Sequence, residues 1–244
     1  MTPFEQTSGT VFNVVAVLTG GALGLLLRDR LPERVVATVV QTLGLTTVLV
    51  GVINALDLTR VTTPPGLIVG LTALATGGAL GEWWRLDDAL ERLGEALKRR
   101  FGGHGTFTQG FVSASLLFCV GPLTLIGSIQ NGLSGDNGFL LLKSALDGIA
   151  ALALAASFGF GVLFSAVTVL VYQGGLSLGA GLFANLVPEP ASDPRVLLVN
   201  GVGGLMIVGL GLDLLQVRRL RIAAMLPALL VVVAFYHLGL LFYR

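Results

Sequence analysis

Two oppositely charged side chains stand inside a long apolar stretch of the sequence. Lys143 and Asp147 are one helical turn apart, the i, i+4 spacing that puts both on one face of a helix. A charge at the centre of a membrane-spanning helix costs roughly 2.5 to 3.5 kcal/mol on insertion scales, so each needs a partner or a purpose. The two can neutralise each other as a structural pin, with Lys143 snorkelling outward. Alternatively, Asp147 titrates or coordinates a cation in the path of an ion or solute.

Amide side chains are candidates for the same path, because each can present a donor and an acceptor to a solute or to a neighbouring helix. Interhelical hydrogen bonding is the default role for any single one. Gln130 and Asn131 lie at the start of the glycine-rich segment NGLSGDNG, near Lys143 and Asp147, and we expect these four to form a polar vestibule that opens outward. The other candidates for the path are Gln41, Asn54, Gln173, Asn200 and the carboxylate Asp213. A short reach to Arg218 or to interfacial water would explain Asp213 without any function.

Two segments predict breaks in membrane helices. Pro122, in CVGPLT, removes a backbone hydrogen bond and is expected to kink its helix, while Gly174 and Gly175, in YQGG, mark a candidate unwound segment. Transporters use broken helices at mid-depth to expose backbone groups to ions and substrates. Prolines and glycines are also ordinary in membrane helices, so the breaks alone do not establish transport.

Catalytic and cofactor motifs are missing from the sequence. It contains no HExxH or Walker A pattern and no His/Glu cluster at metal-ligand spacing. The single cysteine, Cys119, allows no disulfide framework, zinc site or redox pair, and we expect it to be a buried structural thiol. An intramembrane aspartyl enzyme needs two carboxylates that meet, whereas Asp147 and Asp213 are expected at opposite depths. We therefore expect no enzyme, no catalytic residue, no cofactor and no metal site.

The elements that position these residues must be membrane helices. The chain is 54% hydrophobic and only 12% charged, and its mean hydropathy is +0.86, which excludes a soluble fold. Its 34 glycines among 244 residues lie inside apolar runs, as in helices that pack closely in lipid. Fifteen basic and 14 acidic side chains leave no net charge to drive nucleic-acid binding. We predict an all-α, polytopic helical bundle whose partner is the lipid bilayer.

We predict about eight membrane spans, with seven as the alternative, in a single transmembrane domain of residues 1–244. A span needs about 20 largely apolar residues. The apolar block 139–187 is too long for one span, and we divide it near Phe164. The other predicted spans are 9–27, 35–56, 66–84, 107–129, 196–216 and 222–243. Spans 1–3 thus occupy 1–84, spans 4–6 occupy 105–187, and spans 7–8 occupy 196–244.

Residues 85–104 differ from these spans and are predicted to form an amphipathic helix and linker. Leu90, Leu93, Leu97 and Phe101 recur at helical spacing among charged residues, a pattern typical of a helix on the membrane surface. Short cytoplasmic loops retain an excess of Lys and Arg. This rule places both termini outside and the amphipathic helix on the cytoplasmic side, together with the basic residues Arg28, Arg30, Arg34, Arg85, Arg92, Lys98, Arg99, Arg100, Arg218, Arg219 and Arg221.

The sequence repeats part of itself. Thr19–Gly24 and Thr76–Gly81 both spell TGGALG, and Gly44–Leu56 matches Gly121–Leu133 with Asn54 aligned to Asn131. Spans 1 and 2 therefore look duplicated as spans 3 and 4. A weaker similarity between QGGLSLG and VGGLMIVGLGLD would run in the opposite direction across the membrane. That arrangement is an inverted repeat of the type found in secondary transporters.

Several segments resemble a known family. They are GTVFNVVAVLTGGALGLLLRDRLPER at the start, GFVSASLLFCVG, GSIQNGLSGD and KSALDG in the middle, and GVLFSAVTVLVYQGG later. Together they resemble the bacterial membrane family called domain of unknown function 554, over essentially the whole chain. The resemblance implies a multi-spanning bacterial inner-membrane protein. It supplies no activity, substrate or catalytic residue.

Three functional classes follow from these observations. The favoured class is a small transporter or channel for an ion or small polar solute of unknown identity. The second is a non-transporting scaffold or partner subunit, in which the polar residues are structural. The third and least favoured is an intramembrane enzyme acting on a lipid-linked substrate. A chain of 25.3 kDa has little material for two rocking bundles, and its small-residue faces favour association, so we expect a homo-oligomer, with a dimer favoured.

Overall fold

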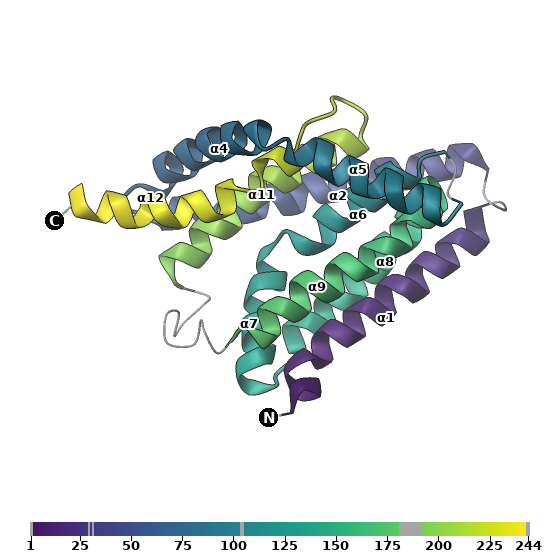
Figure 1. Cartoon of the computed structure of the whole chain (residues 1–244), viewed down its shortest axis with the longest axis horizontal. Coiled ribbons are helices and arrows are strands. Elements are labelled where there is room, and N and C mark those ends of the chain that lie inside the picture. The colour runs from purple at the N-terminus through teal and green to yellow at the C-terminus, as the bar shows by residue number, and fades with distance from the viewer. Residues whose placement is uncertain (1, 29, 31, 103–104, 181–191, 243–244) are drawn as a thin grey trace. The chain divides into compact units, whose positions relative to one another are not determined.

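The computed structural model describes residues 2–28, 30, 32–102, 105–180 and 192–242. Every regular element among these residues is a helix, which confirms the predicted all-α fold (Figure 1). Contacts divide the chain into two compact units. Unit 1 contains Met1–Leu43 and Glu91–Pro188, and unit 2 contains Gly44–Leu90 and Glu189–Arg244. The single transmembrane domain expected over 1–244 stays a prediction.

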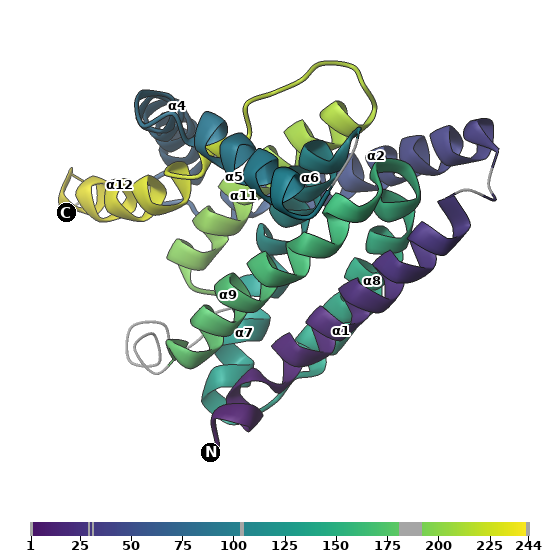
Figure 2. The same ribbon diagram turned by 45° about the vertical axis from the view of Figure 1, so that its right-hand side comes forward.

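Unit 1 is built around two helices that run parallel and touch through their backbones. Its elements are the first part of α2 (Glu33–Ala55), the later part of α5 (Leu86–Arg100), α1 (Pro3–Arg28), α6 (Phe107–Cys119), α7 (Pro122–Ser134), α8 (Gly138–Phe158), the 3-10 helix η1 (Phe160–Phe164) and α9 (Ser165–Leu178). A Cβ atom on Gly20 would lie 2.0 Å from the carbonyl oxygen of Gly148, and one on Gly24 would lie 2.2 Å from that of Leu152. Glycine therefore lets α1 and α8 lie side by side (Figure 2).

Unit 2 is centred on α11 (Pro194–Leu214), whose residues are mostly buried. The later part of α2, α3 (Asp57–Arg60), α4 (Gly66–Trp83), the start of α5, η2 (Ala223–Met225) and α12 (Ala228–Phe242) complete it. Helix α2 crosses α11 where a Cβ on Gly51 would lie 2.8 Å from the Gly204 carbonyl oxygen. Helix α4 packs against η2 and α12 in the same way, through Gly77 and Gly81. Close backbone contacts therefore hold this unit together as well.

Among the described residues, six helical segments are long and apolar enough to cross a membrane, and a bent helix pair raises the number to seven. The pair is α6 with α7, which bend by 59° at their junction. The predicted span 66–84 forms the 18-residue helix α4 but is not among the six, because its glycines and Glu82 dilute its apolar side chains. The six segments that qualify are Pro3–Arg28, Arg34–Arg60, Gly138–Phe158, Phe160–Leu178, Pro194–Leu214 and Ala223–Leu241. Residues 181–187 of predicted span 6 and residue 243 of span 8 lie outside the described part of the chain.

The division of the long apolar block at Phe164 was wrong by five residues. Helix α8 ends at Phe158, and Gly159 turns the chain with a φ of +82°, in the left-handed region that favours glycine. The Arg28 guanidinium occupies the space beside it, since a Cβ on Gly159 would lie 1.9 Å from Arg28 Nη1. Phe164 instead ends the 3-10 helix η1 and leads directly into α9.

The two predicted helix breaks have opposite outcomes. The break at Pro122 is present: α6 ends at Cys119, Gly121 has a φ of +149°, and Pro122 starts α7. The break at Gly174 and Gly175 was wrong, because α9 is continuous from Ser165 to Leu178 and the Gly179 N–H bonds to the Gly175 carbonyl at 2.9 Å. Glycine weakens a helix but leaves its backbone hydrogen bonds intact, whereas proline removes one.

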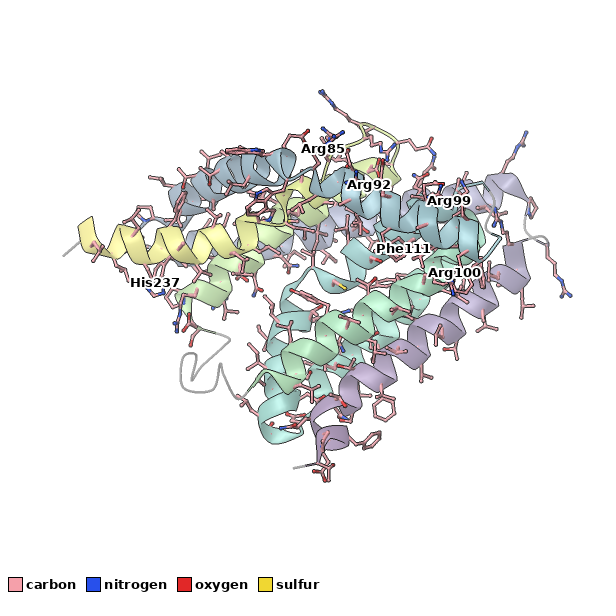
Figure 3. The ribbon with its side chains drawn as sticks, in the orientation of Figure 1. Arg85, Arg92, Arg99, Arg100, Phe111 and His237 are labelled. Atoms are coloured by element: carbon pink, nitrogen blue, oxygen red, sulfur yellow. The ribbon has the colours of Figure 1, made fainter. Side chains whose placement is uncertain are left out.

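The predicted amphipathic segment forms α5, and Figure 3 shows Arg85 directly before this helix and Arg92, Arg99 and Arg100 along it. Leu93 on this helix is exposed. The helix begins at Leu86 and ends at Arg100, while residues 103 and 104 of the predicted linker lie outside the described part of the chain. Thr108 Oγ1 donates to Glu95 Oε1 at 2.6 Å, and this hydrogen bond lowers the pKa of the Glu95 carboxyl. The contact fixes α5 to the start of α6.

Candidate functional site

The ion pair predicted from spacing is formed on α8. Lys143 Nζ donates to Asp147 Oδ2, and only 5% of Lys143 and 8% of Asp147 is exposed. Both residues lie within Gly138–Phe158, one of the segments apolar enough to span a membrane. Burial removes both charges from water, and the attraction between them must offset this desolvation penalty. The pair is therefore held in place by further hydrogen bonds.

Those bonds come from α1 and α9. Asn13 Nδ2 donates to Asp147 Oδ2 at 2.9 Å and to Gln173 Oε1 at 3.0 Å, and Gln173 Nε2 donates to Thr10 Oγ1 at 3.3 Å. Asn13, Thr10 and Gln173 are fully buried. We call these five residues, Lys143, Asp147, Asn13, Gln173 and Thr10, the polar cluster. It joins α1, α8 and α9 through side chains alone.

Sequence reasoning missed Asn13 and Thr10. A signal for them exists, because Gly9, Asn13 and Val17 recur every four residues and lie on the buried face of α1 that continues to Gly20 and Gly24. Asn13 thus occupies a position on the helix face whose glycines let α8 approach. A polar residue on such a face is brought against the partner helix by the packing itself.

The polar cluster leaves two oxygen atoms unused. Lys143 and Asn13 both donate to Oδ2 of Asp147, and no residue described by the structure donates to Oδ1. Asn13 Oδ1 is buried and also has no partner among the described residues. The amide cannot be turned over to satisfy this oxygen, because Oδ1 would then face two other acceptors, Asp147 Oδ2 and Gln173 Oε1.

Asn131 forms a second polar group at the start of α1. Its Oδ1 accepts from the Gly9 N–H at 3.1 Å, and its Nδ2 donates to the Glu5 carbonyl at 3.1 Å and to Ser8 Oγ at 3.2 Å. The side chain is fully buried. Gln130 instead donates to Asp136 Oδ2 at 3.0 Å in an exposed position. Asn131 therefore ties α7 to α1 next to the polar cluster, and Gln130, also on α7, bonds to the loop residue Asp136.

Hydroxyl and thiol groups extend the polar interior of unit 1. Ser128 Oγ on α7 and Ser177 Oγ on α9 are buried with no hydrogen-bond partner among the described residues. Ser177 follows Gln173 by one helical turn, and Ser115 Oγ lies 3.1 Å from Thr168 Oγ1 between α6 and α9. Cys119, at the end of α6, is buried as predicted and lies close enough to Lys143 and Asp147 to feel their charges. Because Cys119 ends α6, the polar cluster lies within electrostatic range of the α6–α7 break.

Six predicted path residues are not part of the polar cluster: Gln130 and Asn131, described above, and four others. Gln41 is exposed on α2, and Asn54, Asn200 and Asp213 belong to unit 2. Asn200 is buried in α11, and Asp213 is half-buried with Arg219 as its electrostatic partner in place of the expected Arg218. Of the nine predicted path residues, the polar cluster contains Lys143, Asp147 and Gln173, and the path through all nine stays a prediction.

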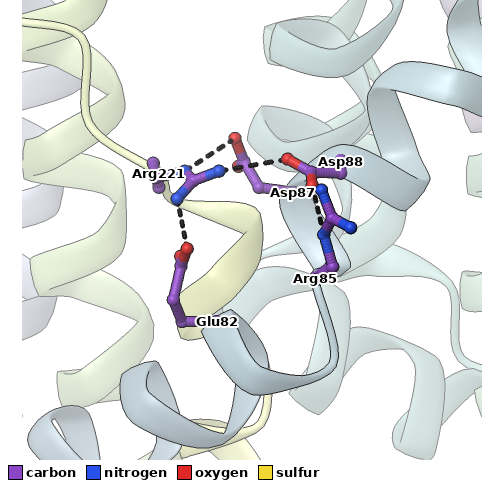
Figure 4. A network of polar contacts seen from close by, with 5 residues as sticks. All are labelled: Glu82, Arg85, Asp87, Asp88 and Arg221. Atoms are coloured by element: carbon purple, nitrogen blue, oxygen red, sulfur yellow. Dashed lines mark hydrogen bonds and ion pairs between the residues drawn. The ribbon is translucent and has the colours of Figure 1, made fainter.

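Unit 2 has a charged network of its own, at the junction of α4, α5 and the segment before η2 (Figure 4). Arg221 pairs with Glu82, with Asp88 at 3.0 Å and with Asp87 at 3.9 Å, and Arg85 pairs with Asp88 at 2.8 Å. The Arg221 side chain is 54% exposed. Exposed ion pairs are worth about 0 to 1 kcal/mol, so this network orients the segments more than it stabilises them.

Resident metal sites of the usual protein ligands are not evident. Within the described residues, no group of three or more His, Cys, Asp or Glu side chains could hold a metal ion. The polar cluster instead offers one carboxylate with amide and hydroxyl oxygens, which are hard ligands. Such a set suits a small cation, a proton or a hydrogen-bonding solute.

Comparison with known proteins gives the relatives of this chain. It is 29% identical over 223 residues to "Uncharacterized membrane protein YdfK" of Bacillus subtilis (strain 168), covering 91% of this chain and 93% of that protein. It is also 29% identical over 229 residues to "Uncharacterized protein YqgA" of Escherichia coli (strain K12), with the same coverage of each chain. No solved structure matches this chain. A family model matches residues 8–237, and the chain therefore belongs to the family described as "Protein of unknown function (DUF554)".

Proposed function

We propose that this protein is a bacterial inner-membrane transporter or channel for an ion or small polar solute, and that its path passes the polar cluster of unit 1. The observation that carries the proposal is a buried Lys–Asp pair, hydrogen-bonded to amides of neighbouring helices, inside segments apolar enough to span a membrane. Ionisable residues in such segments are rare and commonly mark ion or substrate pathways. No enzymatic role is proposed.

The broken helix next to the polar cluster supports this proposal. Cys119 and Pro122 flank the junction of α6 and α7, and Thr124 Oγ1 donates to the Phe118 carbonyl at 3.2 Å. Breaks of this kind free backbone groups inside the membrane, and transporters use those groups to bind ions. A break close to a buried charge pair therefore supports a transport path.

The distribution of charge within unit 1 supports an orientation. Basic residues gather where α1 and α8 end. Arg28 lies beside Gly159. The ring centroids of Phe101 and Phe164 are 4.8 Å apart, and Phe101 directly follows Lys98, Arg99 and Arg100 in the sequence. The opposite end, near Asn131, carries Glu5 and Asp136. The positive-inside rule then puts the basic end in the cytoplasm. We propose that both termini are outside, as the loop charges predict.

A second candidate function is a scaffold or partner subunit that transports nothing. The hydrogen bonds of Asn131 favour it, because this amide joins α7 to the backbone of α1 as interhelical glue would. In that case the polar cluster is also a structural device. A homodimer is proposed under either function.

Transport is tested by reconstituting the purified protein in liposomes and screening solute flux and membrane currents over ions and small metabolites. Asp147→Asn and Lys143→Met are expected to abolish any flux of the wild type. The double variant carrying both changes leaves no unpaired charge, so it separates lost transport from lost folding. Asp213→Asn is the matched control, a carboxylate in a span of unit 2, and should keep wild-type flux. Wild-type flux in the folded double variant, or no flux across the panel, would move the assignment to the scaffold.

A further inference from the structure

Three buried polar atoms of unit 1 have no hydrogen-bond partner among the described residues. They are Asn13 Oδ1 on α1, Ser128 Oγ on α7 and Ser177 Oγ on α9, and all three side chains are fully buried. Such atoms are uncommon in folded proteins, because each has given up its hydrogen bonds to water without replacing them. Three of them in one unit therefore point to a ligand.

The two serine hydroxyls differ from most hydroxyls on the helices of this chain. Those commonly donate to a carbonyl of the preceding turn, as Ser157 Oγ does to the Ala153 carbonyl at 3.0 Å. Ser128 and Ser177 make no such bond. Each of their hydroxyls therefore keeps a donor and an acceptor for another group.

Ser177 connects the positions of the other two residues. Helices α7 and α9 touch at Gly132, where a Cβ would lie 2.0 Å from the Ser177 carbonyl oxygen, and Ser128 precedes Gly132 by one turn. On α9, Ser177 follows Gln173 by one turn, and Gln173 Oε1 accepts from Asn13 Nδ2 at 3.0 Å. One turn advances about 5.4 Å along a helix axis. Ser177 is thus about one turn from each of the two partners.

Asn13 and Ser128 are also brought together through α8. Leu140 of α8 fills the space beside both Gly9 and Gly127, since a Cβ on Gly9 would lie 2.6 Å and one on Gly127 2.7 Å from its side chain. Gly9 precedes Asn13 by one turn of α1, and Gly127 directly precedes Ser128 on α7. The three unpartnered atoms therefore gather where α1, α7 and α9 meet, beside the polar cluster.

The chemistry of this place restricts the ligand. An amide oxygen such as Asn13 Oδ1 only accepts, whereas a serine hydroxyl both donates and accepts, so the ligand must donate at least one hydrogen bond. The nearby charges restrict it further, because Lys143 and Asp147 neutralise each other. An ion placed beside this pair in an apolar span would lose its hydration without gaining a counter-charge. The ligand is therefore uncharged.

We propose that Asn13, Ser128 and Ser177 form a binding site for one small uncharged solute that carries hydroxyl or amide groups. This inference rests on the proposed function and names its substrate class. The solute donates to Asn13 Oδ1 and exchanges hydrogen bonds with the two serine hydroxyls. Asp147 positions Asn13 through their 2.9 Å hydrogen bond and is not itself a ligand.

Binding is measured on the full-length protein in detergent by equilibrium dialysis. The probes are radiolabelled glycerol, erythritol and urea, with radiolabelled methylammonium as the charged probe. At least one uncharged probe is expected to bind saturably, at about one molecule per chain, and methylammonium is expected not to bind. The proposal is overturned when none of the uncharged probes binds saturably, and equally when methylammonium alone binds.

Serine variants test the residues. The double variant Ser128→Ala with Ser177→Ala should weaken binding roughly tenfold or more, as the loss of two hydrogen bonds predicts. Its thermal unfolding without solute should match or exceed that of the wild type, because the hydroxyls it removes have no partner among the described residues. Ser157→Ala is the matched control and should keep the wild-type affinity, since that hydroxyl is bonded to its own helix. Wild-type affinity in the folded double variant would contradict the proposal.

The failure of this inference differs from the failure of the proposed function. An ion flux in liposomes that Asp147→Asn abolishes, without binding of any uncharged probe in detergent, keeps the transporter and refutes the solute site. Saturable binding of an uncharged probe in detergent, with no flux in liposomes, keeps the site and refutes transport.

Discussion

The two units use the same six residues, TGGALG, for packing, and they differ in what stands beside the motif. In unit 1, Gly20 and Gly24 touch the backbone of α8, which runs parallel to α1. In unit 2, Gly77 would place a Cβ 2.4 Å from Ala228 N, and Gly81 one 1.9 Å from the Ala224 carbonyl oxygen, so the partner runs antiparallel. The motif therefore specifies close approach and leaves the direction of the partner open.

Residues on the helical turns next to the TGGALG motif determine whether the packed contact is polar or apolar. In α1 the motif is preceded by Asn13, which meets the charged pair of α8. In α4 it is preceded by Gly70 and Ala73, and the partner α12 presents apolar residues such as Val232. The comparison teaches that a glycine motif provides the contact and that polar residues one or two turns away decide whether the contact becomes a site.

The largest expected difference between the units concerns buried charge. Asp147→Ala leaves Lys143 unpaired in unit 1 and should lower the free energy of unfolding by about 3 kcal/mol. Asp213→Ala, in a half-buried position of unit 2, should cost clearly less. Denaturant titration of the protein in mixed micelles, followed by circular dichroism, measures both. Equal losses would mean that the pair in α8 is not held more tightly than an ordinary interfacial carboxylate.

The packing motif should be equally sensitive in both units. Gly20→Ala and Gly81→Ala force a Cβ against a backbone oxygen and should each cost about 1 to 3 kcal/mol, as overpacking does. Gly78→Ala is the matched control inside the same motif, since nothing lies within 4 Å of its Cβ position. It should be neutral or slightly stabilising. Thermal unfolding of the three variants checks this, and a loss at Gly78 as large as at Gly81 would contradict close approach as the cause.

The exposed network of unit 2 should matter less than the buried pair of unit 1. Arg221→Ala removes contacts to Glu82, Asp87 and Asp88, yet the expected loss of stability is below about 1 kcal/mol because these pairs lie in water. Salt sharpens the contrast: 0.5 M KCl should erase the effect of Arg221→Ala and leave that of Asp147→Ala largely intact. A loss at Arg221 that survives high salt would show that the network is shielded from solvent.

The smallest expected effect is a pH dependence at the start of α11. Burial raises the pKa of Asp193, but hydrogen bonds from Arg195, including one from its backbone N–H at 2.8 Å, outweigh this and hold the pKa below its usual value. The stabilisation is therefore present above the unfolded pKa of about 3.9 and is lost as the pH falls through the lower folded pKa. Asp193→Asn should lower the midpoint of thermal unfolding at pH 7, and this difference should shrink below about pH 4. The equivalent Asn137 of α8 makes no capping hydrogen bond and should show no such dependence when replaced by Ser.

Local rules predicted the features that lie within one segment. The i, i+4 spacing of Lys143 and Asp147 predicted their ion pair, and the chemistry of Pro122 predicted the end of α6. Features that depend on a second segment escaped prediction. Asn13 meets Asp147 only through the register of α1 on α8, and the chain turns at Gly159 beside Arg28, a residue of another helix.

The repeats show the same limit. Asn131 is buried against α1, whereas its aligned counterpart Asn54 is only partly buried. Residues that align in the sequence repeat therefore occupy different environments, and the inverted repeat stays a prediction. The segment predicted to be unwound at Gly174 and Gly175 is a continuous helix, because tertiary packing decides whether a local weakness in the sequence interrupts a helix.

The contact between Asn13 and Asp147 also orders events during synthesis. The two residues are 134 positions apart, and translation at roughly 5 to 20 residues per second separates their emergence by on the order of ten seconds. Asn13 must enter the bilayer early as a lone amide, which lipid tolerates better than a charge. Lys143 and Asp147 arrive together on one helix, already neutralised by each other. Because both charged residues are made together, the spans of unit 1 can enter the membrane without exposing an unpaired charge to lipid.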